Sequence, residues 1–195
     1  MEAVNSCIEI QDDYIKAYVV KGNIYIRMNK LNDALATFRQ ITEINRKYYP
    51  AWDKIGFIHY NTKNYDEAIP AYQKVIELKP DYEKPYENLG VIYSEKKEWD
   101  KAIENLEKAT ELSPKESTIW YRLAAAYNAK GMAGEAKEAA TTALKLKPNW
   151  AAAQIELGAA ERRLGNRDAA RNAFRMAAKD PKWKKVAEYE LQSVK

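Results

Sequence analysis

The sequence predicts an all-α protein made of tandem antiparallel helix hairpins, and three observations lead to that prediction. A pattern of aromatic, aliphatic and small residues recurs about every 34 residues along most of the chain. Within each copy, the apolar positions fall on two separate stripes at helical spacing, as expected of two helices that pack against each other. Several copies end in a proline at the same position, and no strand is evident.

The clearest copy is the stretch from residue 49 to residue 82, numbered here as positions 1 to 34. Large aromatic residues stand at positions 4 and 24, small residues at positions 8 and 20, and a proline at position 32. Because small residues let two helix backbones approach while large ones fill the remaining space, this combination favours a close hairpin. These five positions are occupied by Trp52, Gly56, Ala68, Tyr72 and Pro80.

This pattern resembles the tetratricopeptide repeat, and the resemblance extends over five tandem copies. It implies a right-handed α-solenoid, or superhelix, with terminal capping helices. The first helices of such repeats line a concave groove that holds extended peptides or short helices of partner proteins. The predicted divisions of this single solenoid domain are a partial repeat with only its second helix at 1–14, repeats at 15–48, 49–82, 83–116, 117–150 and 151–182, and a C-terminal capping helix at 183–195.

Individual copies depart from the pattern at a few positions. The first has Arg46 where proline is usual, and the fourth has Ala140 at position 24, so a large side chain is missing there. The fifth places Gln154 and Glu161 at core positions, which suggests that one of its faces is a terminus. Pro70 falls inside a second helix, and we expect it close to the first turn, where a missing backbone donor costs little.

Both ends carry apolar stripes at helical spacing, which predict terminal helices. Cys7 is expected to be a small buried residue, because its neighbours are acidic rather than basic and do not favour a reactive thiol. The predicted N-terminal stripe consists of Val4, Cys7, Ile8 and Ile10, and the C-terminal one of Trp183, Val186, Ala187, Leu191 and Val194.

Composition excludes several classes of protein. With 46% hydrophobic and 31% charged residues, the chain is neither disordered nor membrane-embedded, and no apolar run reaches the roughly 20 residues of a spanning helix. A single cysteine cannot form an internal disulfide, so a reducing, cytoplasmic location is the default. Because the chain starts in the middle of a repeat, a periplasmic or anchored location is possible if an upstream segment was removed.

The groove predicted by the resemblance narrows the candidate binding residues. If positions 4, 7, 8 and 11 are buried, positions 2, 5, 6, 9, 12 and 13 face the groove. Asn23, Lys54, Asn88 and Arg122 there offer hydrogen-bond donors, whereas Val19, Ile26, Phe57, Tyr60 and Val91 form an apolar strip. Such residues can also merely solvate a helix face or pack within the superhelix. The predicted peptide-binding residues are Asn23, Lys54, Phe57, Tyr60, Asn88, Val91, Tyr121, Arg122 and Asn128.

One known use of the family, a clamp for a C-terminal carboxylate, is not expected. The clamp needs lysine and asparagine at positions 5 and 9 of one repeat, where the second repeat has Asp53 and Phe57. Only Asn88 and Arg122 match its five positions. Asp53 would repel a carboxylate.

We predict a non-catalytic scaffold that binds an extended or helical segment of a protein partner. The only histidine, His59, stands at a core position, and the sequence has no recognisable metal ligands or cofactor motif. One alternative is self-association through the open N-terminal edge. Another is docking of the basic C-terminal segment to an anionic surface, although a net charge of +4 does not favour nucleic acid or membrane partners.

Overall fold

The computed structural model describes residues 2–194, and the side chains of residues 14–194. Over these residues the chain forms eleven helices and no strand, which confirms the all-α prediction. The chain divides into two compact units, Met1–Pro85 and Tyr86–Lys195. Each unit is described below by itself.

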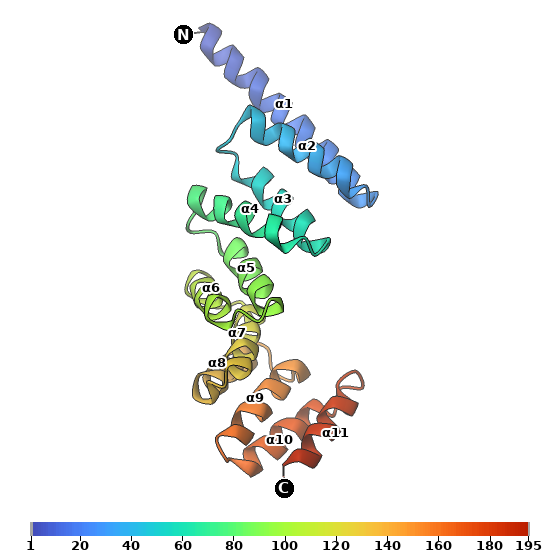
Figure 1. Ribbon diagram of the computed structural model, residues 1–195, viewed down its shortest axis with the longest axis vertical. Helices are drawn as coiled ribbons and strands as arrows, with labels where there is room; N and C mark the ends of the chain where they lie inside the picture. The colour runs from blue at the N-terminus through green and yellow to red at the C-terminus, as the bar shows by residue number, and fades with distance from the viewer. Residues whose placement is uncertain (1, 195) are drawn as a thin grey trace. The chain divides into compact units, whose positions relative to one another are not determined.

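The first unit is built from two helix hairpins in which consecutive helices pack against each other (Figure 1). Its core contains Phe38 and Ile41 from one hairpin and Ile55 and Ile58 from the other. These four side chains repeat the apolar stripes seen in the sequence. The helices are α1 (Glu2–Arg27), α2 (Leu31–Ile44), α3 (Tyr49–Asn61) and α4 (Tyr65–Leu78).

The second unit continues the hairpin pattern and ends with a single helix (Figure 1). Helix α7 packs against α6, α8 and α9, and α10 packs against α9 and α11. The first helices α5, α7 and α9 begin at position 1 of a repeat as numbered from the sequence. The helices are α5 (Glu83–Glu95), α6 (Trp99–Leu112), α7 (Ser117–Lys130), α8 (Ala133–Leu146), α9 (Ala151–Arg163), α10 (Arg167–Ala177) and α11 (Lys184–Ser193).

The expected break between a partial repeat and the first full repeat is absent. Helix α1 instead continues without interruption from Glu2 to Arg27. The physical reason lies at Asp12, which occupies position 32, where a proline ends the corresponding helices of later repeats. Asp12 retains its backbone donor and has no ring to clash with the preceding turn. The predicted burial of Cys7 lies outside the residues whose side chains are described.

A glycine at position 8 faces a large side chain at position 24 of the same hairpin. A Cβ on Gly56 would lie 2.8 Å from the Tyr72 ring, and one on Gly158 would lie 2.4 Å from the Phe174 ring. The same close approach links Gly22 to Phe38 and Gly90 to Leu106. The fourth repeat instead pairs Ala124 with Ala140, both fully buried. Its missing large side chain is therefore matched by a Cβ at position 8.

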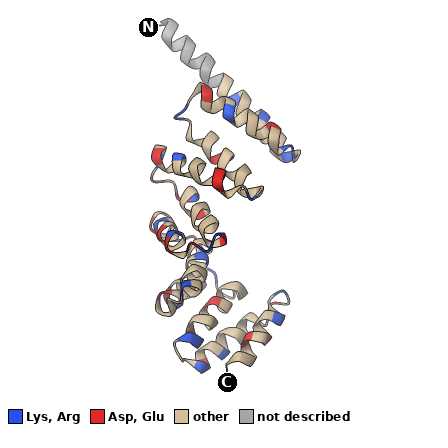
Figure 2. Cartoon of the chain, viewed as in Figure 1, with Lys and Arg blue, Asp and Glu red and all other residues tan. Residues whose placement is uncertain are grey.

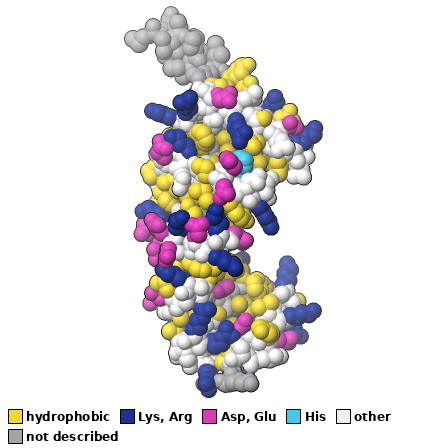
Figure 3. Space-filling view, in the orientation of Figure 1, with side chains coloured by type: hydrophobic (Ala, Val, Ile, Leu, Met, Phe, Trp, Pro, Cys, Tyr) yellow, Lys and Arg dark blue, Asp and Glu magenta, His cyan; other side chains and the backbone are white. Residues whose placement is uncertain are grey.

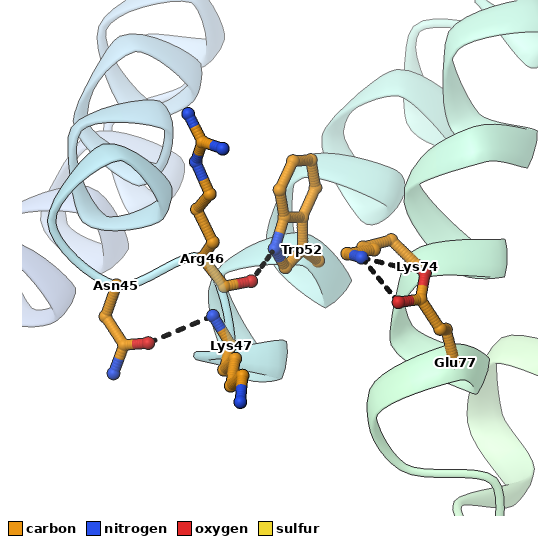
Figure 4. Close-up of polar contacts among 6 residues, drawn as sticks. All are labelled: Asn45, Arg46, Lys47, Trp52, Lys74 and Glu77. Carbon is orange, nitrogen blue, oxygen red and sulfur yellow. Dashed lines mark hydrogen bonds and ion pairs between the residues drawn. The ribbon is translucent and has the colours of Figure 1, made fainter.

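Tryptophan at position 4 fixes the entry of the chain into a first helix. The indole nitrogen of Trp52 donates to the Arg46 carbonyl at 2.9 Å (Figure 4), and that of Trp120 donates to the Pro114 carbonyl at the same distance. Both acceptors stand at position 32 of the preceding repeat. The contact gives a partner both to a carbonyl in the linker between hairpins and to the indole donor.

The turn inside every full repeat places its position 15 in the left-handed region. Asn29, Lys63 and Lys97 have φ values of 57°, 58° and 59°, and Gly131 and Gly165 have φ values of 90° and 80°. Left-handed residues commonly end helices, because they let the next amides bond to the last carbonyls. The repeat thus ends its first helix at one position with three different residue types.

The sequence led us to expect Pro70 close to the first turn of its helix, where a missing backbone donor costs little, but the proline lies further inside. Helix α4 begins at Tyr65, so Pro70 is its sixth residue and lies inside the helix. The amide that proline lacks would have bonded to the carbonyl four residues earlier, within the helix. Because Pro70 is exposed, water can reach its surroundings.

Helix α11 covers the last hairpin with Ala187 and Val194, which are buried against residues of α9 and α10. Trp183 and Leu191 are partly buried in the same contacts. Val186, which was predicted to share this face, is exposed instead. It lies one residue before Ala187, so it points about 100° away around the helix.

Candidate functional site

In the first unit, the predicted binding residues of α3 form a mixed apolar and cationic surface. The Phe57 side chain is 39% exposed, and the Lys54 ammonium lies 5.8 Å from the centre of its ring. One turn away, Tyr60 is partly buried, with its ring 6.3 Å from that of Tyr65 on α4. An aromatic ring that is exposed and flanked by a cation can contact an apolar side chain and an acidic group together.

Asp53 lies beside this surface and is only partly exposed. Burial raises the pKa of its carboxyl, and Lys54 and Lys84 act in the opposite direction. Burial raises the pKa of the Tyr82 phenol to about 12, and the Asp53 carboxylate adds to this rise. Burial, followed by the charge of Asp53, also raises the pKa of the Tyr72 phenol. The Tyr72 hydroxyl is buried without a hydrogen-bond partner. This part of α3 therefore combines a partly buried carboxyl with the nearby charge of Lys54.

In the second unit, Arg122 of α7 reaches across to Glu87 of α5. Its guanidinium nitrogen donates to the Glu87 carboxylate at 2.7 Å, and Glu87 is buried. A buried carboxylate needs a partner of this kind, because leaving its charge unpaired would be costly. Arg122 is therefore already engaged. A free carboxylate ligand would have to compete with Glu87 for it.

Asn128, near the end of α7, is 6% exposed and connects α7 to α9. Its amide nitrogen donates to the carbonyl of Glu156 at 2.9 Å and to the carboxylate of Glu156 at 2.8 Å. Arg163 donates to the backbone carbonyl of Asn128. Burial raises the pKa of the Glu156 carboxyl, whereas the Asn128 hydrogen bond and the Arg163 charge lower it. The amide of Asn128 thus positions Glu156, and its own surface is closed to solvent.

Tyr121 lies next to this network on α7. Its ring centre is 4.8 Å from that of Trp150, and burial, followed by the charge of Glu156, raises the pKa of its phenol. Asn88 and Val91 of α5 are both partly buried. The face of α5, α7 and α9 in this unit therefore carries carboxylates, guanidinium groups and an aromatic ring close together.

Models of the tetratricopeptide repeat family match residues 15–48, 48–115 and 93–149 of the chain. The chain belongs to this family. Three overlapping matches that together reach from residue 15 to residue 149 confirm the family assignment. No match was found among curated proteins.

Solved structures of other tetratricopeptide repeat proteins have the same fold. YrrB, described as a TPR protein with an unusual peptide-binding site, is 19% identical, with 95% of each chain covered and a TM-score of 0.81. A MamA protein is 24% identical over 91% of this chain and 96% of its own, with a TM-score of 0.79. MamA from Desulfovibrio magneticus RS-1 is 20% identical over 86% and 94%, with a TM-score of 0.79. At these identities the likeness concerns the fold.

Three predicted donors occupy the same place in their tetratricopeptide repeats. Lys54, Asn88 and Arg122 all stand at position 6, whereas Asn23 stands at position 9 of the first repeat. Position 6 of that repeat is Val20. Two predicted apolar residues of α1, Val19 and Ile26, pack against the core of the first unit and are not freely exposed.

Sequence reasoning missed Glu156 because the comparison of groove positions stopped at the fourth repeat. Glu156 stands at position 6 of the fifth repeat, one period after Arg122. Continuing the series by one repeat would have found it. Its partner Arg163 stands at position 13, which is also on the predicted groove face.

The sequence also singled out His59 and the basic C-terminal segment. His59 is buried, and burial lowers the pKa of its imidazole. Among the described residues, no cluster of histidine, cysteine, aspartate and glutamate could hold a metal ion, and none of the described helices is long and apolar enough to cross a membrane. In the basic C-terminal segment, Arg162 pairs with Glu190 and Arg171 with Asp168.

Proposed function

We propose that the chain is a non-catalytic interaction scaffold whose first-helix faces bind an extended or helical segment of a partner protein. Membership of the tetratricopeptide repeat family supports a role in protein interactions. The similarity to YrrB, a TPR protein described as having a peptide-binding site, supports a peptide-like ligand. The proposal needs no bond to be made or broken at the site.

The observation that carries the proposal is the polar surface that Arg122 and Glu156 form on α7 and α9. Arg122 and Glu156 occupy the same position in successive repeats, and each is fixed by a partner, Glu87 and Asn128 respectively. Side chains that are already held in place lose little conformational entropy when a ligand binds, which favours affinity. The aromatic ring of Tyr121 adds contact area between them.

This surface favours a ligand that carries both hydrogen-bond donors and acceptors, such as a peptide backbone. The Glu156 carboxylate accepts hydrogen bonds, and the Arg122 guanidinium donates them. A ligand with only one sign of charge would be attracted by one of these groups and repelled by the other. In the first unit, Lys54 and Phe57 offer a second contact, suited to a side chain with an apolar body.

The proposal is tested by partner capture followed by a binding measurement with a synthetic segment. The immobilised chain captures proteins from an extract of its source cells, and the segment of a captured partner is then titrated calorimetrically. We expect the variant Phe57→Ala/Asn88→Ala/Arg122→Ala to bind that segment about tenfold or more weakly, because a single dominant contact residue contributes about 2 kcal/mol or more and tenfold corresponds to about 1.4 kcal/mol.

The control replaces charges on the opposite face of a hairpin. Lys108 and Glu111 of α6 are exposed and pair with each other at 2.8 Å. The variant Lys108→Ala/Glu111→Ala should bind the segment as the unmodified protein does. Unchanged binding by the folded Phe57, Asn88 and Arg122 variant would overturn the proposal. Loss of binding in moderate salt in all proteins alike would indicate an electrostatic contact elsewhere.

A further inference from the structure

A groove of about 460 Å³ opens on the second unit, where residues of α6, α7 and α8 meet. Its volume lies within the range of about 300–1,000 Å³ that is typical of ligand sites. Helix α7 contributes Trp120, Leu123 and Tyr127 to its surface. The indole nitrogen of Trp120 donates to the Pro114 carbonyl, so the ring has a fixed orientation. Trp120 and Tyr127 lie on another side of α7 from Arg122, so this groove is separate from the surface proposed above to bind a segment.

Acidic side chains from α6 and α8 line the same groove, and Figure 2 shows acidic residues on both helices. They are Glu107, Glu111, Glu135 and Glu138. Glu111 already pairs with Lys108 at 2.8 Å. Glu107 accepts a hydrogen bond from the Tyr127 hydroxyl. Among the described residues, no ion pair involves the two carboxylates of α8. Acidic side chains also gather on the surface at the level of α6 in Figure 3. The groove is therefore negatively charged, and its own residues neutralise that charge only in part.

Tyr127 stands at position 11 of its repeat, and in the other repeats a basic side chain of the chain itself interacts with position 11. In the first repeat, the Lys21 ammonium is 5.9 Å from the centre of the Tyr25 ring. In the third, the Lys101 ammonium is 5.3 Å from the centre of the Tyr93 ring. A cation within about 6 Å of a ring centre is attracted by the negative face of the ring. Each of these two tyrosines is thus matched by a lysine.

The second and fifth repeats have other residues at position 11, and these also interact with a basic group. Burial lowers the pKa of the His59 imidazole, and the charge of Arg39 lowers it further. The carboxylate of Glu161 pairs with Lys137 at 3.0 Å. The fourth repeat is the exception. Burial raises the pKa of the Tyr127 phenol, and the further groups that raise it are glutamates of the groove. Tyr127 thus interacts with acidic groups where each counterpart interacts with a basic one.

The basic residue of the third repeat is replaced by an acidic one in the fourth. Lys101 and Glu135 both stand at position 19 of their repeats, and Glu135 lines the groove. Every basic residue of α6, α7 and α8 except Lys145 already pairs with an acidic group. Lys145 lies in the last turn of α8, about two turns beyond Glu138. Within these three helices, which are described in full, the groove therefore has no basic residue available to it.

We propose that this groove binds a lysine or arginine side chain from a basic segment of a partner protein. Such a side chain has a long apolar stem, which can lie along the Trp120 ring, and a charged end, which can reach Glu135 and Glu138. Cations are attracted to the faces of aromatic rings, most strongly to tryptophan, so the stem and the charge are favoured in the same place. The incoming cation takes the place beside Tyr127 that a lysine of the chain takes in the third repeat. This inference does not rest on the function proposed above.

A short basic peptide tests the proposal on the full chain. The probe is acetyl-Gly-Arg-Gly-Lys-Gly-amide. Its matched control carries citrulline and norleucine in place of arginine and lysine, which keeps the length of the side chains and removes their charge. Binding is followed through the backbone amide signals in NMR spectra. We expect the basic peptide to shift signals of α6, α7 and α8, and to bind at least about tenfold more tightly than the control, a difference of about 1.4 kcal/mol.

Three variants test the groove residues. Glu135→Lys copies the third repeat and should weaken binding of the basic peptide about tenfold or more, because a lysine of the chain then occupies the place beside Tyr127. The matched control is Glu188→Lys, which makes the same change in charge at an exposed residue of α11 and should bind normally. Glu135→Gln/Glu138→Gln removes two charges at constant size and should weaken binding about three- to tenfold, as expected for two partly exposed ion pairs. Circular dichroism checks that every variant is helical.

The variant Phe57→Ala/Asn88→Ala/Arg122→Ala separates this proposal from the earlier one. Its three residues lie outside the groove, so it should bind the basic peptide as the unmodified protein does. If this variant weakened the binding of the basic peptide, the peptide would occupy the first-helix surface instead, and the groove proposal would fail.

Several other results would overturn the proposal. Equal binding of the basic and the neutral peptide would show that the groove does not recognise charge. Equal weakening by Glu135→Lys and Glu188→Lys would show that only the net charge of the chain matters. Unshifted signals of α6, α7 and α8 would place the binding elsewhere. Tighter binding of spermidine, with the same shifts, would identify a free polyamine rather than a protein segment as the ligand.

Discussion

Replacing Gly158 with alanine should weaken the packing between α9 and α10. A Cβ at this position would lie 2.4 Å from Cε1 and 2.7 Å from Cδ1 of Phe174. Phe174 is fully buried, so its ring cannot move aside into solvent. Either the ring must leave its preferred rotamer or the two helices must separate, and both changes cost packing energy.

The magnitude follows from two opposing effects. Overpacking a filled core costs about 1–3 kcal/mol, whereas alanine is favoured over glycine inside a helix by about 1 kcal/mol. Because the overlap at Gly158 is severe, we expect a net loss of about 1–2 kcal/mol. The control is Gly134→Ala in α8, where a Cβ would meet nothing within 4 Å. That change should stabilise the protein, but by less than the gain of about 0.5–1 kcal/mol that is typical of the middle of a helix, because Gly134 is the second residue of α8.

Urea unfolding followed by circular dichroism measures the free energy of unfolding of both variants. The double variant Gly158→Ala/Phe174→Ala recreates the pair that the fourth repeat has at Ala124 and Ala140. Its loss of stability should be about 1–2 kcal/mol smaller than the sum of the losses of the two single variants. The reason is that the overlap exists in Gly158→Ala but is absent once Phe174 is also replaced. If Gly158→Ala is as stabilising as Gly134→Ala, the reasoning on close approach is refuted.

Two further predictions concern a turn and a buried histidine. Lys97→Gly should raise the free energy of unfolding by up to about 1 kcal/mol, because glycine adopts the left-handed region without the cost of a Cβ. Lys97→Ala keeps that Cβ and should give no such gain in the same urea titration. Since burial and the nearby Arg39 lower the pKa of His59 in the folded state, the unfolded chain binds a proton first, so stability should fall as pH drops below about 6.5. The variant His59→Tyr, which has the residue of other repeats at this position, should lose that dependence in thermal melts from pH 7.5 to 5.5; an unchanged dependence would show that another group causes it.

The fold was predictable because the repeat constrains several positions at once. Gly56 and Tyr72 are each common residues, but their spacing within a repeated frame indicates that one helix backbone approaches the other. Where the frame lost a signal, the prediction was wrong. Asp12 in place of a proline allowed α1 to continue, and the start of α4 at Tyr65 moved Pro70 beyond the first turn.

The candidate site was harder to predict, because periodicity identifies a helix face but not the partners of its side chains. Arg122 was predicted as a donor for a ligand, yet it already donates to Glu87 on the neighbouring first helix. Asn128 was predicted on the same face, yet it is buried and positions Glu156. Such pairs join residues 28 or 35 positions apart, and their formation depends on rotamers that a spacing rule does not specify.

Position 6 of the first helix lies outside the packing of the hairpin. The packing of each hairpin constrains positions 8 and 24 through their mutual contact, but position 6 lies on the other side of the first helix and is free to vary. In α7 and α9 it carries Arg122 and Glu156, each held by a neighbouring side chain, as expected of a polar binding surface. In α1 it carries Val20, which is apolar and exposed. The residue at this position can therefore differ in charge and polarity from one repeat to the next, and with it the ligand that a repeat favours, without any change in the core.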